Sequence, residues 1–281
     1  MKLLKSATEL TLMVKTEKGN GLSVGFVPTM GALHEGHISL IENSRRENSL
    51  TVCSIFVNPT QFNNPDDFKK YPKTIEKDID MLEKWGCDVL FLPEVEEIYQ
   101  QGVQLKQYNL GYLETLLEGK YRPGHFQGVC QVVDRLLEIV IPDKLYIGQK
   151  DYQQCMVISK LVELRKYDCQ IVICPTLREP DGLAMSSRNL RLNALQRKLA
   201  VNIFETMQLV KSELNKGETG QVKHKAENKL SNAGFKVDYV EISDAKTLEP
   251  INNWDGNQEA VVLIAAYLDD IRLIDNMLLD S

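Results

Sequence analysis

Two histidines, His34 and His37, stand three residues apart, directly after an apolar run and a glycine-containing turn. At the start of a helix, residues at this spacing lie on one face, beside backbone N–H groups that lack partners within the helix. The partial positive charge of a helix N-terminus, together with two imidazole donors, suits a phosphate oxygen. Gly36 between them lets a flat ligand approach the backbone, because glycine has no Cβ. The pattern therefore indicates an anion site; the alternative is a pair of solvent-exposed histidines.

Two polar segments further along have the residue types of structured turns. The segment 58–63, N-P-T-Q-F-N, carries the uncharged amide of Gln61, although Asn, Pro and Thr are also ordinary turn residues. The segment 121–128 combines rigid proline, permissive glycine and a single histidine, His125. We interpret His125 as a structural hydrogen-bonding residue and not as a catalytic one.

Phosphate chemistry is indicated again at two later places. Lys150 follows an apolar run and supplies a mobile point charge for a polyphosphate. Asp151 beside it either takes part in the same phosphate chemistry or caps the next helix. The segment 175–189 ends in two hydroxyls and a guanidinium, Ser186, Ser187 and Arg188. These residue types either bind phosphate or cap the helix that follows.

Four strings resemble one known family, the pantoate–β-alanine ligases (pantothenate synthetases), which belong to a nucleotidyl-transferring superfamily marked by H-x-G-H. H-x-G-H alone is a weak signal, but the ten consecutive residues 28–37, P-T-M-G-A-L-H-E-G-H, match the family. The other strings are N-P-x-Q-F at 58–62, R-P-G-H-F-x-G-V at 122–129 and P-T-x-R-E-x-D-G-L-A-M-S-S-R-N at 175–189. The family string G-E-K-D-x-Q-Q also fits 148–154, except that Gln149 stands where glutamate is usual, and we assign that position no role.

The resemblance implies that ATP activates (R)-pantoate as pantoyl adenylate, which β-alanine then converts to pantothenate with release of AMP. The implied ATP-binding residues are Met30, His34, His37, Gly148, Lys150, Asp151, Leu177, Met185, Ser186, Ser187 and Arg188. The implied catalytic residues are His37, His34 and Lys150, and the implied pantoate and β-alanine contacts are Gln61 and Gln154. Mg²⁺ is expected with ATP. Its protein ligands are not evident, and Asp78 and Asp80 are candidates. The family also implies a homodimer.

Two other functions fit parts of this pattern. A nucleotidyltransferase that joins a phosphate-containing acceptor to AMP would also carry H-x-G-H, but it should present Arg or Lys to that acceptor, whereas Gln61 and Gln154 are neutral. A catalytically silent nucleotide-binding protein should have lost a histidine, Lys150 or the S-S-R string, and all of them are intact.

The elements that position these residues alternate between strand and helix patterns. Apolar runs predict strands at 22–27, 50–57, 89–92, 144–148 and 170–174, and helical stripes fall at 74–85 and 129–140. We expect an α/β fold with a Rossmann-like, mostly parallel sheet and helices on both faces. The first strand should stop at Pro28, because proline lacks the N–H that a central strand needs. Ligands of such sheets bind at the carboxyl ends of the strands, which is where each motif falls.

The character of the chain changes near residue 176. A loop leads to a long helix over about 194–216 and a second helix over about 221–234. Strands at 237–242 and 261–268, separated by turn residues, then indicate antiparallel pairing. We therefore expect a Rossmann-like domain over 1–175 that binds ATP and pantoate, and a smaller α+β domain over 176–281 that covers the site.

Composition limits the class of protein. The 281 residues contain 43% hydrophobic and 26% charged residues, which is ordinary for a soluble globular chain. A net charge of −6 argues against a general nucleic-acid-binding surface. The six cysteines show no metal-binding or disulfide spacing, so we expect reduced core thiols in a cytoplasmic protein. We expect no secretory signal and no membrane span.

Overall fold

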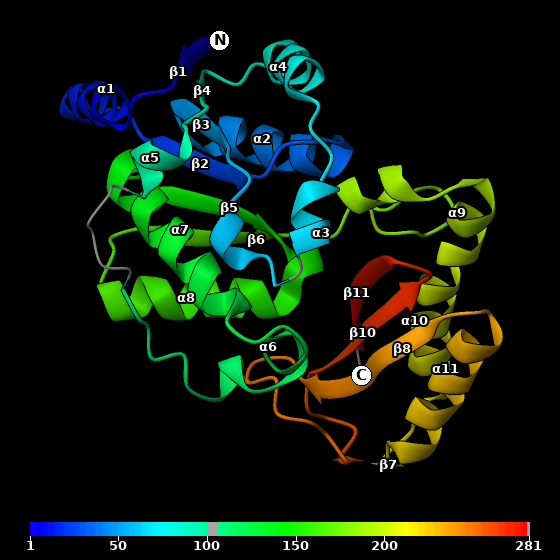
Figure 1. Ribbon diagram of the computed structural model, residues 1–281. Helices are drawn as coiled ribbons and strands as arrows, with labels where there is room; N and C mark the ends of the chain where they lie inside the picture. Colours follow the sequence, from blue (N-terminus) through cyan, green and yellow to red (C-terminus); the bar gives the residue numbers. More distant parts are fainter. Residues whose placement is uncertain (64, 100–105, 280–281) are drawn as a thin grey trace. The chain divides into compact units, whose positions relative to one another are not determined.

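The computed structural model describes residues 1–63, 65–99 and 106–279, which form two compact units (Figure 1). The first unit comprises Met1–Gln149 and Gln153–Pro175. The second comprises Thr176–Ser281 together with the short segment Lys150–Tyr152. The phosphate-binding lysine predicted from the sequence therefore groups with the second unit, although it follows a strand of the first.

The first unit is built on a parallel sheet with the strand order β1-β4-β3-β2-β5-β6, which confirms the predicted α/β class. Its strands are β1 (Lys2–Leu4), β2 (Val24–Thr29), β3 (Leu50–Ile55), β4 (Val89–Phe91), β5 (Lys144–Gly148) and β6 (Gln170–Cys174). Its longer helices are α1 (Ala7–Gly19), α2 (Glu35–Glu47), α4 (Ile75–Lys84), α7 (His125–Val140) and α8 (Tyr152–Arg165). Shorter ones are η1 (Pro59–Gln61), α3 (Pro65–Lys69), α5 (Val95–Ile98), η2 (Gly111–Glu114) and α6 (Leu117–Tyr121). The short helix η3 (Gln149–Asp151) has its first residue in this unit and the other two in the second.

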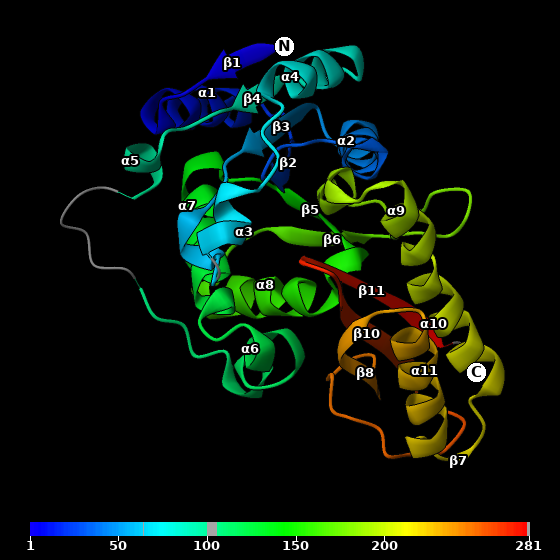
Figure 2. The same ribbon diagram turned by 45° about the vertical axis from the view of Figure 1, so that its right-hand side comes forward.

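Helices cover both faces of this sheet, with α2 and α4 on one side and α1 and α7 on the other (Figure 2). The apolar side of α2 buries Ile38, Leu40 and Ile41, as its spacing predicts. From β2 the chain runs to β3 and β4 in one direction, and β5 and β6 are added on the opposite side of β2. The order therefore reverses between β2 and β5, where sheets of this class bind ligands.

Two details of the sheet differ from the sequence prediction. Strand β2 does not stop at Pro28, which pairs with Ser54 of β3 and is followed in the strand by Thr29. The proline is tolerated because β5 pairs only with Gly25 and Phe26, so no ladder hydrogen bond on that side requires its N–H. The three-residue strand β1, which pairs with β4, was too short to predict from its pattern.

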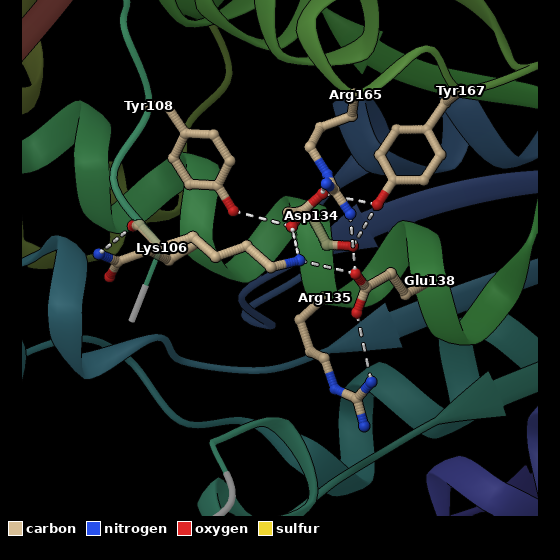
Figure 3. Close-up of polar contacts among 8 residues, drawn as sticks. Lys106, Tyr108, Asp134, Arg135, Glu138, Arg165 and Tyr167 are labelled. Atoms are coloured by element: carbon tan, nitrogen blue, oxygen red, sulfur yellow. Dashed lines mark hydrogen bonds and ion pairs between the residues drawn. The ribbon is translucent and has the colours of Figure 1, made fainter. Parts of the chain in front are cut away.

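A buried carboxylate joins α7 and α8 to the segment that begins at Lys106 (Figure 3). Asp134 accepts hydrogen bonds from Lys106 Nζ at 2.9 Å, Tyr108 Oη at 2.8 Å, Arg165 Nε at 2.8 Å and Tyr167 Oη at 2.6 Å. Burial raises the pKa of Asp134, but these four hydrogen bonds outweigh burial and hold it below its ordinary value. The cluster stabilises the first unit.

The second unit packs helices against an antiparallel sheet with the order β11-β10-β8. Its elements are η4 (Ser187–Arg191), α9 (Ala194–Ala200), α10 (Asn202–Glu213), β7 (Gly217–Glu218), α11 (Gly220–Asn232), β8 (Lys236–Asp244), β9 (Asn253–Trp254), β10 (Ala260–Leu268) and β11 (Ile271–Leu279). Its core includes Met207 of α10, Leu230 of α11 and Ile264 of β10. No helix in the described part of either unit is both long and apolar enough to cross a membrane.

The single long helix predicted over about 194–216 is instead two helices, α9 and α10, separated at Val201. Val201 keeps helical angles, φ −61° and ψ −25°. The side chain of Asn202 donates to the carbonyl of Leu199 at 2.9 Å, so it competes with the backbone for an acceptor next to the break. Strand β11 was also missed, because polar Arg272, Asp275 and Asn276 interrupt its apolar pattern.

Candidate active site

The two predicted histidines form the N-terminal cap of α2. His34 Nδ1 accepts a hydrogen bond from the N–H of Gly36 at 3.2 Å, and His37 Nδ1 accepts one from the N–H of His34 at 3.3 Å. The ring centroids are 4.1 Å apart. A ring nitrogen that accepts an N–H carries no proton, so each neutral imidazole holds its proton on Nε2. The cap therefore fixes both rings as Nε2–H donors, which suits phosphate oxygens.

A buried aspartate holds the turn in front of these histidines. Asp78 of α4 is 2% exposed and accepts the N–H groups of Ala32 and Leu33, each at 2.9 Å. Thr74 Oγ1 donates to the same carboxylate at 3.0 Å. Gly31 and Ala32 have positive φ angles of 82° and 49°, and alanine adopts such angles only at a cost in energy. Asp78 compensates that cost and so sets where α2 begins.

The predicted substrate contact Gln61 is oriented by a residue to which the sequence analysis gave no role. Asn58 is buried, and its Oδ1 accepts the N–H of Thr60 at 3.3 Å and the hydroxyl of Tyr99 at 2.7 Å. Its Nδ2 therefore donates, to Gln61 Oε1 at 3.0 Å. The other end of the Gln61 amide, Nε2, lies 3.1 Å from Met30 Sδ. Gln61 is thus held with its NH₂ group toward Met30.

The segment around His125 holds the backbone of Gln61 in place. His125 is buried, and its Nδ1 lies 2.8 Å from the backbone oxygen of Gln61, which can only accept. Arg122 Nη1 lies 3.1 Å from the other ring nitrogen and can only donate. A Cβ on Gly128 would lie 2.4 Å from the backbone oxygen of Thr60, so glycine permits the close approach of α7 to η1. His125 has the structural role that we expected.

Lys150 and Asp151 lie in the short helix η3, after β5. The Lys150 side chain is 16% exposed, and its Nζ lies 3.6 Å from Asp151 Oδ1. The backbone oxygen of Lys150 accepts a hydrogen bond from Asn276 Nδ2 on β11 at 2.8 Å. Nearby, Tyr152 Oη donates to the backbone oxygen of Ala245 at 2.6 Å. These two bonds attach the lysine segment to the second unit.

The segment that carries the serines and arginine forms a tight hairpin followed by η4. Arg178 pairs with Ala184 in a β-bridge, and the N–H of Met185 donates to the oxygen of Leu177 at 3.0 Å. At its turn, Gly182 has φ +92° and packs so closely on Phe204 that a Cβ would lie 2.1 Å from the ring. Ser186 then caps η4, its Oγ accepting the N–H of Arg188 at 3.3 Å.

The predicted site residues thus fall into two groups. In the first unit, Met30 and Gln61 are in contact and the two histidines are adjacent. Gly148 ends β5 beside β2, and Gln154 lies in the first turn of α8. In the second unit lie Lys150, Asp151, Leu177, Met185, Ser186, Ser187 and Arg188.

A family model described as pantoate-beta-alanine ligase matches residues 2–278 of this chain. The chain belongs to the pantoate–β-alanine ligase family. The pantothenate synthetase of Cytophaga hutchinsonii is 45% identical over 279 residues, which cover 98% of each chain. That of Bacteroides thetaiotaomicron is 41% identical over 278 residues, covering 99% of this chain and 98% of the relative.

Two solved structures have the same fold over almost the whole ligase. Pantothenate synthetase from Thermus thermophilus has a TM-score of 0.89 at 39% identity, with 99% of each chain covered. The pantoate-beta-alanine ligase of Francisella tularensis, described as complexed with beta-gamma ATP and beta-alanine, has a TM-score of 0.84 at 37% identity. The alignment with it covers 100% of this chain and 98% of the other. The chain is therefore an enzyme, an ATP-dependent ligase of pantoate and β-alanine.

The candidate metal ligands of the ligase do not form a metal site. Asp78 already accepts three hydrogen bonds in a buried position, and Asp80 is exposed. Residues two apart on a helix point in nearly opposite directions, so these carboxylates cannot chelate one ion. Within 1–63, 65–99 and 106–279, no group of three His, Cys, Asp or Glu side chains is placed to hold a metal.

Residues that the motifs did not reveal also contact the predicted site segments. Asn58 lay inside a motif but was assigned no role, while Asp78, Asp275 and Asn276 lay outside every motif. A signal for the last two was present, since two adjacent polar residues in an otherwise apolar strand indicate buried hydrogen bonding. Nothing in the local sequence distinguishes Asp78 from an ordinary helix-surface carboxylate.

Proposed function

We propose that this chain joins (R)-pantoate to β-alanine in two steps, with the predicted site residues of both units binding the substrates. A carboxylate oxygen of pantoate attacks the α-phosphorus of ATP, and pyrophosphate leaves. The amine of β-alanine then attacks the acyl carbon of pantoyl adenylate, and AMP leaves with the bridging oxygen. The observation that carries the proposal is the cap of α2 at the strand-order reversal, in which Nδ1 of His34 and of His37 each accepts a backbone N–H, within a chain-long family match.

The phosphate donors act by positioning and by stabilising charge. Displacement at phosphorus needs little else from the protein, so imidazole N–H groups, the Lys150 ammonium and the Arg188 guanidinium are assigned to phosphate oxygens. Ser186 and Ser187 are assigned to the same phosphates, and Gly148 and Asp151 to other parts of ATP. Met30, Leu177 and Met185 are assigned to the nucleotide as contacts of its adenosine end.

The acid is held by neutral amides. Because Asn58 occupies the Gln61 carbonyl, Gln61 is assigned as an N–H donor to pantoate or β-alanine oxygens. The side chain of Gln154 is half-buried and makes no hydrogen bond to another side chain or to backbone in the described residues, so its amide can bind pantoate. Neutral amides orient the attacking carboxylate without the strong ground-state stabilisation that an arginine pair would give.

The remaining assignments extend the family resemblance. Mg²⁺ is proposed to arrive with ATP as part of the substrate, where it would neutralise phosphate charge. The enzyme is proposed to be a cytoplasmic homodimer that acts on small molecules and binds neither nucleic acid nor membrane. Sedimentation of the purified chain tests the dimer.

Product identification tests the function directly. Purified protein mixed with ATP, Mg²⁺, pantoate and β-alanine should give pantothenate, AMP and pyrophosphate in equal amounts. Labelled pyrophosphate should exchange into ATP with pantoate alone, because the first step needs no amine. Exchange that requires β-alanine would contradict a separate adenylation step, and transfer of AMP to a phosphate-containing acceptor would favour the nucleotidyltransferase alternative.

A further inference from the structure

Two adjacent polar residues lie buried in the last strand of the second unit. Asp275 and Asn276 of β11 are 4% and 2% exposed, between the apolar residues Ile274 and Met277. Burying such groups is unfavourable unless they are hydrogen-bonded. Their side chains contact the two segments to which phosphate binding is assigned.

Asp275 holds the base of the serine–arginine hairpin. Its carboxylate accepts hydrogen bonds from both Nη atoms of Arg178, at 2.6 and 3.1 Å, in a bidentate ion pair. The same guanidinium donates to the backbone oxygens of Gly182 at 3.0 Å and Asn276 at 3.1 Å, and lies 4.9 Å from the ring centre of Phe204. Burial raises the pKa of Asp275, and Arg178 opposes that rise. Arg178 therefore ties the hairpin turn to β11, just ahead of the residues that lead into η4.

Asn276 holds the lysine segment. Its Nδ2 donates to the backbone oxygen of Lys150 at 2.8 Å, so the strand fixes the point from which the lysine side chain projects. The N–H of Asn276 in turn donates to Asp275 Oδ1 at 2.8 Å. One dipeptide therefore contacts both segments, and all of these residues lie within the second unit.

We propose that Asp275 and Asn276 are positioning residues that set the Lys150 ammonium and the Ser186–Arg188 segment at a fixed separation for one triphosphate. The proposal rests on the proposed function, in which both segments bind the phosphates of ATP. It assigns the C-terminal strand a part in catalysis, although neither residue touches a reacting atom.

The test is Asn276→Ala in the full-length chain, measured by pyrophosphate exchange with pantoate. A misplacement of about 1 Å can cost about 10²-fold, so the expected loss in the adenylation rate is about 10- to 100-fold. The matched control is Asn202→Ala, which removes another asparagine-to-carbonyl bond in the same unit, to Leu199 at 2.9 Å. The control should retain its rate within about twofold, because the bond that it removes reaches neither the lysine segment nor the serine–arginine hairpin. Equal rates in the two variants would overturn the proposal.

A double-mutant cycle asks whether Asn276 acts through Lys150. If it does, Asn276→Ala should have little further effect in a Lys150→Ala background, because the group that it positions is gone. If the fold-losses in adenylation rate of Asn276→Ala and Lys150→Ala instead multiplied in the double variant, Asn276 would act independently of Lys150, which would overturn the proposal. If Asn276→Ala does not fold, the similarly sized Asn276→Leu removes the donor without adding a charge. Failure of both variants to fold would also overturn the positioning role.

Failure of the proposed function gives a different result. In that case the wild-type chain itself would make no pantothenate and show no pantoate-dependent exchange. An active wild type with an unaffected Asn276→Ala variant would reject only the positioning role of the strand.

Discussion

The side-chain amide of Asn58 donates to the side-chain oxygen of Gln61 over 3.0 Å, which turns the Gln61 NH₂ group toward Met30. The orientation follows from acceptors elsewhere, because the N–H of Thr60 donates to Asn58 Oδ1 and leaves Nδ2 as the donor. The Asn58 amide thus fixes the orientation of the Gln61 amide, with its NH₂ group left for a ligand.

Asn58→Ala should therefore raise the KM for pantoate about tenfold, through loss of about 1.4 kcal/mol of orientation and hydrogen bonding, and leave the KM for ATP nearly unchanged. Steady-state kinetics with each substrate varied in turn measure both constants. Asn109→Ala is a suitable control, since Asn109 is exposed and caps only a local turn through Gly111. A parallel rise in both KM values would mean that Asn58 supports the fold and not the amide.

Asp78→Asn should lower both the free energy of unfolding and the adenylation rate. An amide cannot accept from Ala32 and Leu33 with both of its ends, so one buried N–H loses its partner, at a cost of about 1–3 kcal/mol. The exposed Asp80→Asn is the control two residues away. Denaturant titration and pyrophosphate exchange measure the two effects. Recovery of the rate at high Mg²⁺ would instead make Asp78 a metal ligand.

His37→Asn should separate the cap from catalysis. The asparagine oxygen can replace Nδ1 as the acceptor of the His34 N–H, so stability should be retained, whereas the Nε2–H donor is lost. Removing one such donor typically lowers the rate by about 10²–10³-fold. His37→Ala should lose a similar rate and, in addition, about 1 kcal/mol of stability through the cap. If His37→Asn exchanged pyrophosphate at the wild-type rate, His37 would not be a residue of the phosphate site.

Asp134 should make the first unit sensitive to acid. Because the pKa of Asp134 is lower in the folded chain than its unfolded value of about 3.9, its stabilisation is complete above that value and is lost as pH falls through the folded pKa. Asp134→Asn should cost about 1–3 kcal/mol at neutral pH, since an amide cannot accept all four of the hydrogen bonds that the carboxylate accepts. Lys106 and Arg165 keep their ion pairs with Glu138.

The matching measurement is the free energy of unfolding against pH for wild type, Asp134→Asn and the control Asp168→Asn. Asp168 is exposed and makes no ion pair with the described residues, so the control should follow the wild-type curve. The stability gap between wild type and Asp134→Asn should narrow below about pH 4. A gap that is constant with pH would assign the effect to packing and not to the charge.

The sequence by itself determined the sheet class, the order of the motifs and the chemistry of their residues. Apolar runs bounded by turn residues report burial directly, and parallel strands bring their carboxyl ends to one edge, so the segments after β2, β3 and β5 had to lie near each other. The sequence also predicted that α2 begins at the two histidines, although not that their rings cap it. The hydrogen bonds of this cap span only two or three residues, so local backbone geometry settles them.

Only the tertiary structure decided which distant groups hold those residues in place. Asp78 reaches Ala32 across 46 positions and Asp275 reaches Arg178 across 97, and no local pattern links such pairs. Pro28 remains in its strand because the neighbouring strand ends early, and the break at Val201 follows a side chain that competes for a backbone carbonyl. Chain-local geometry fixes short-range hydrogen bonds, whereas long-range ones exist only after packing has brought buried polar groups together and left each in need of a partner.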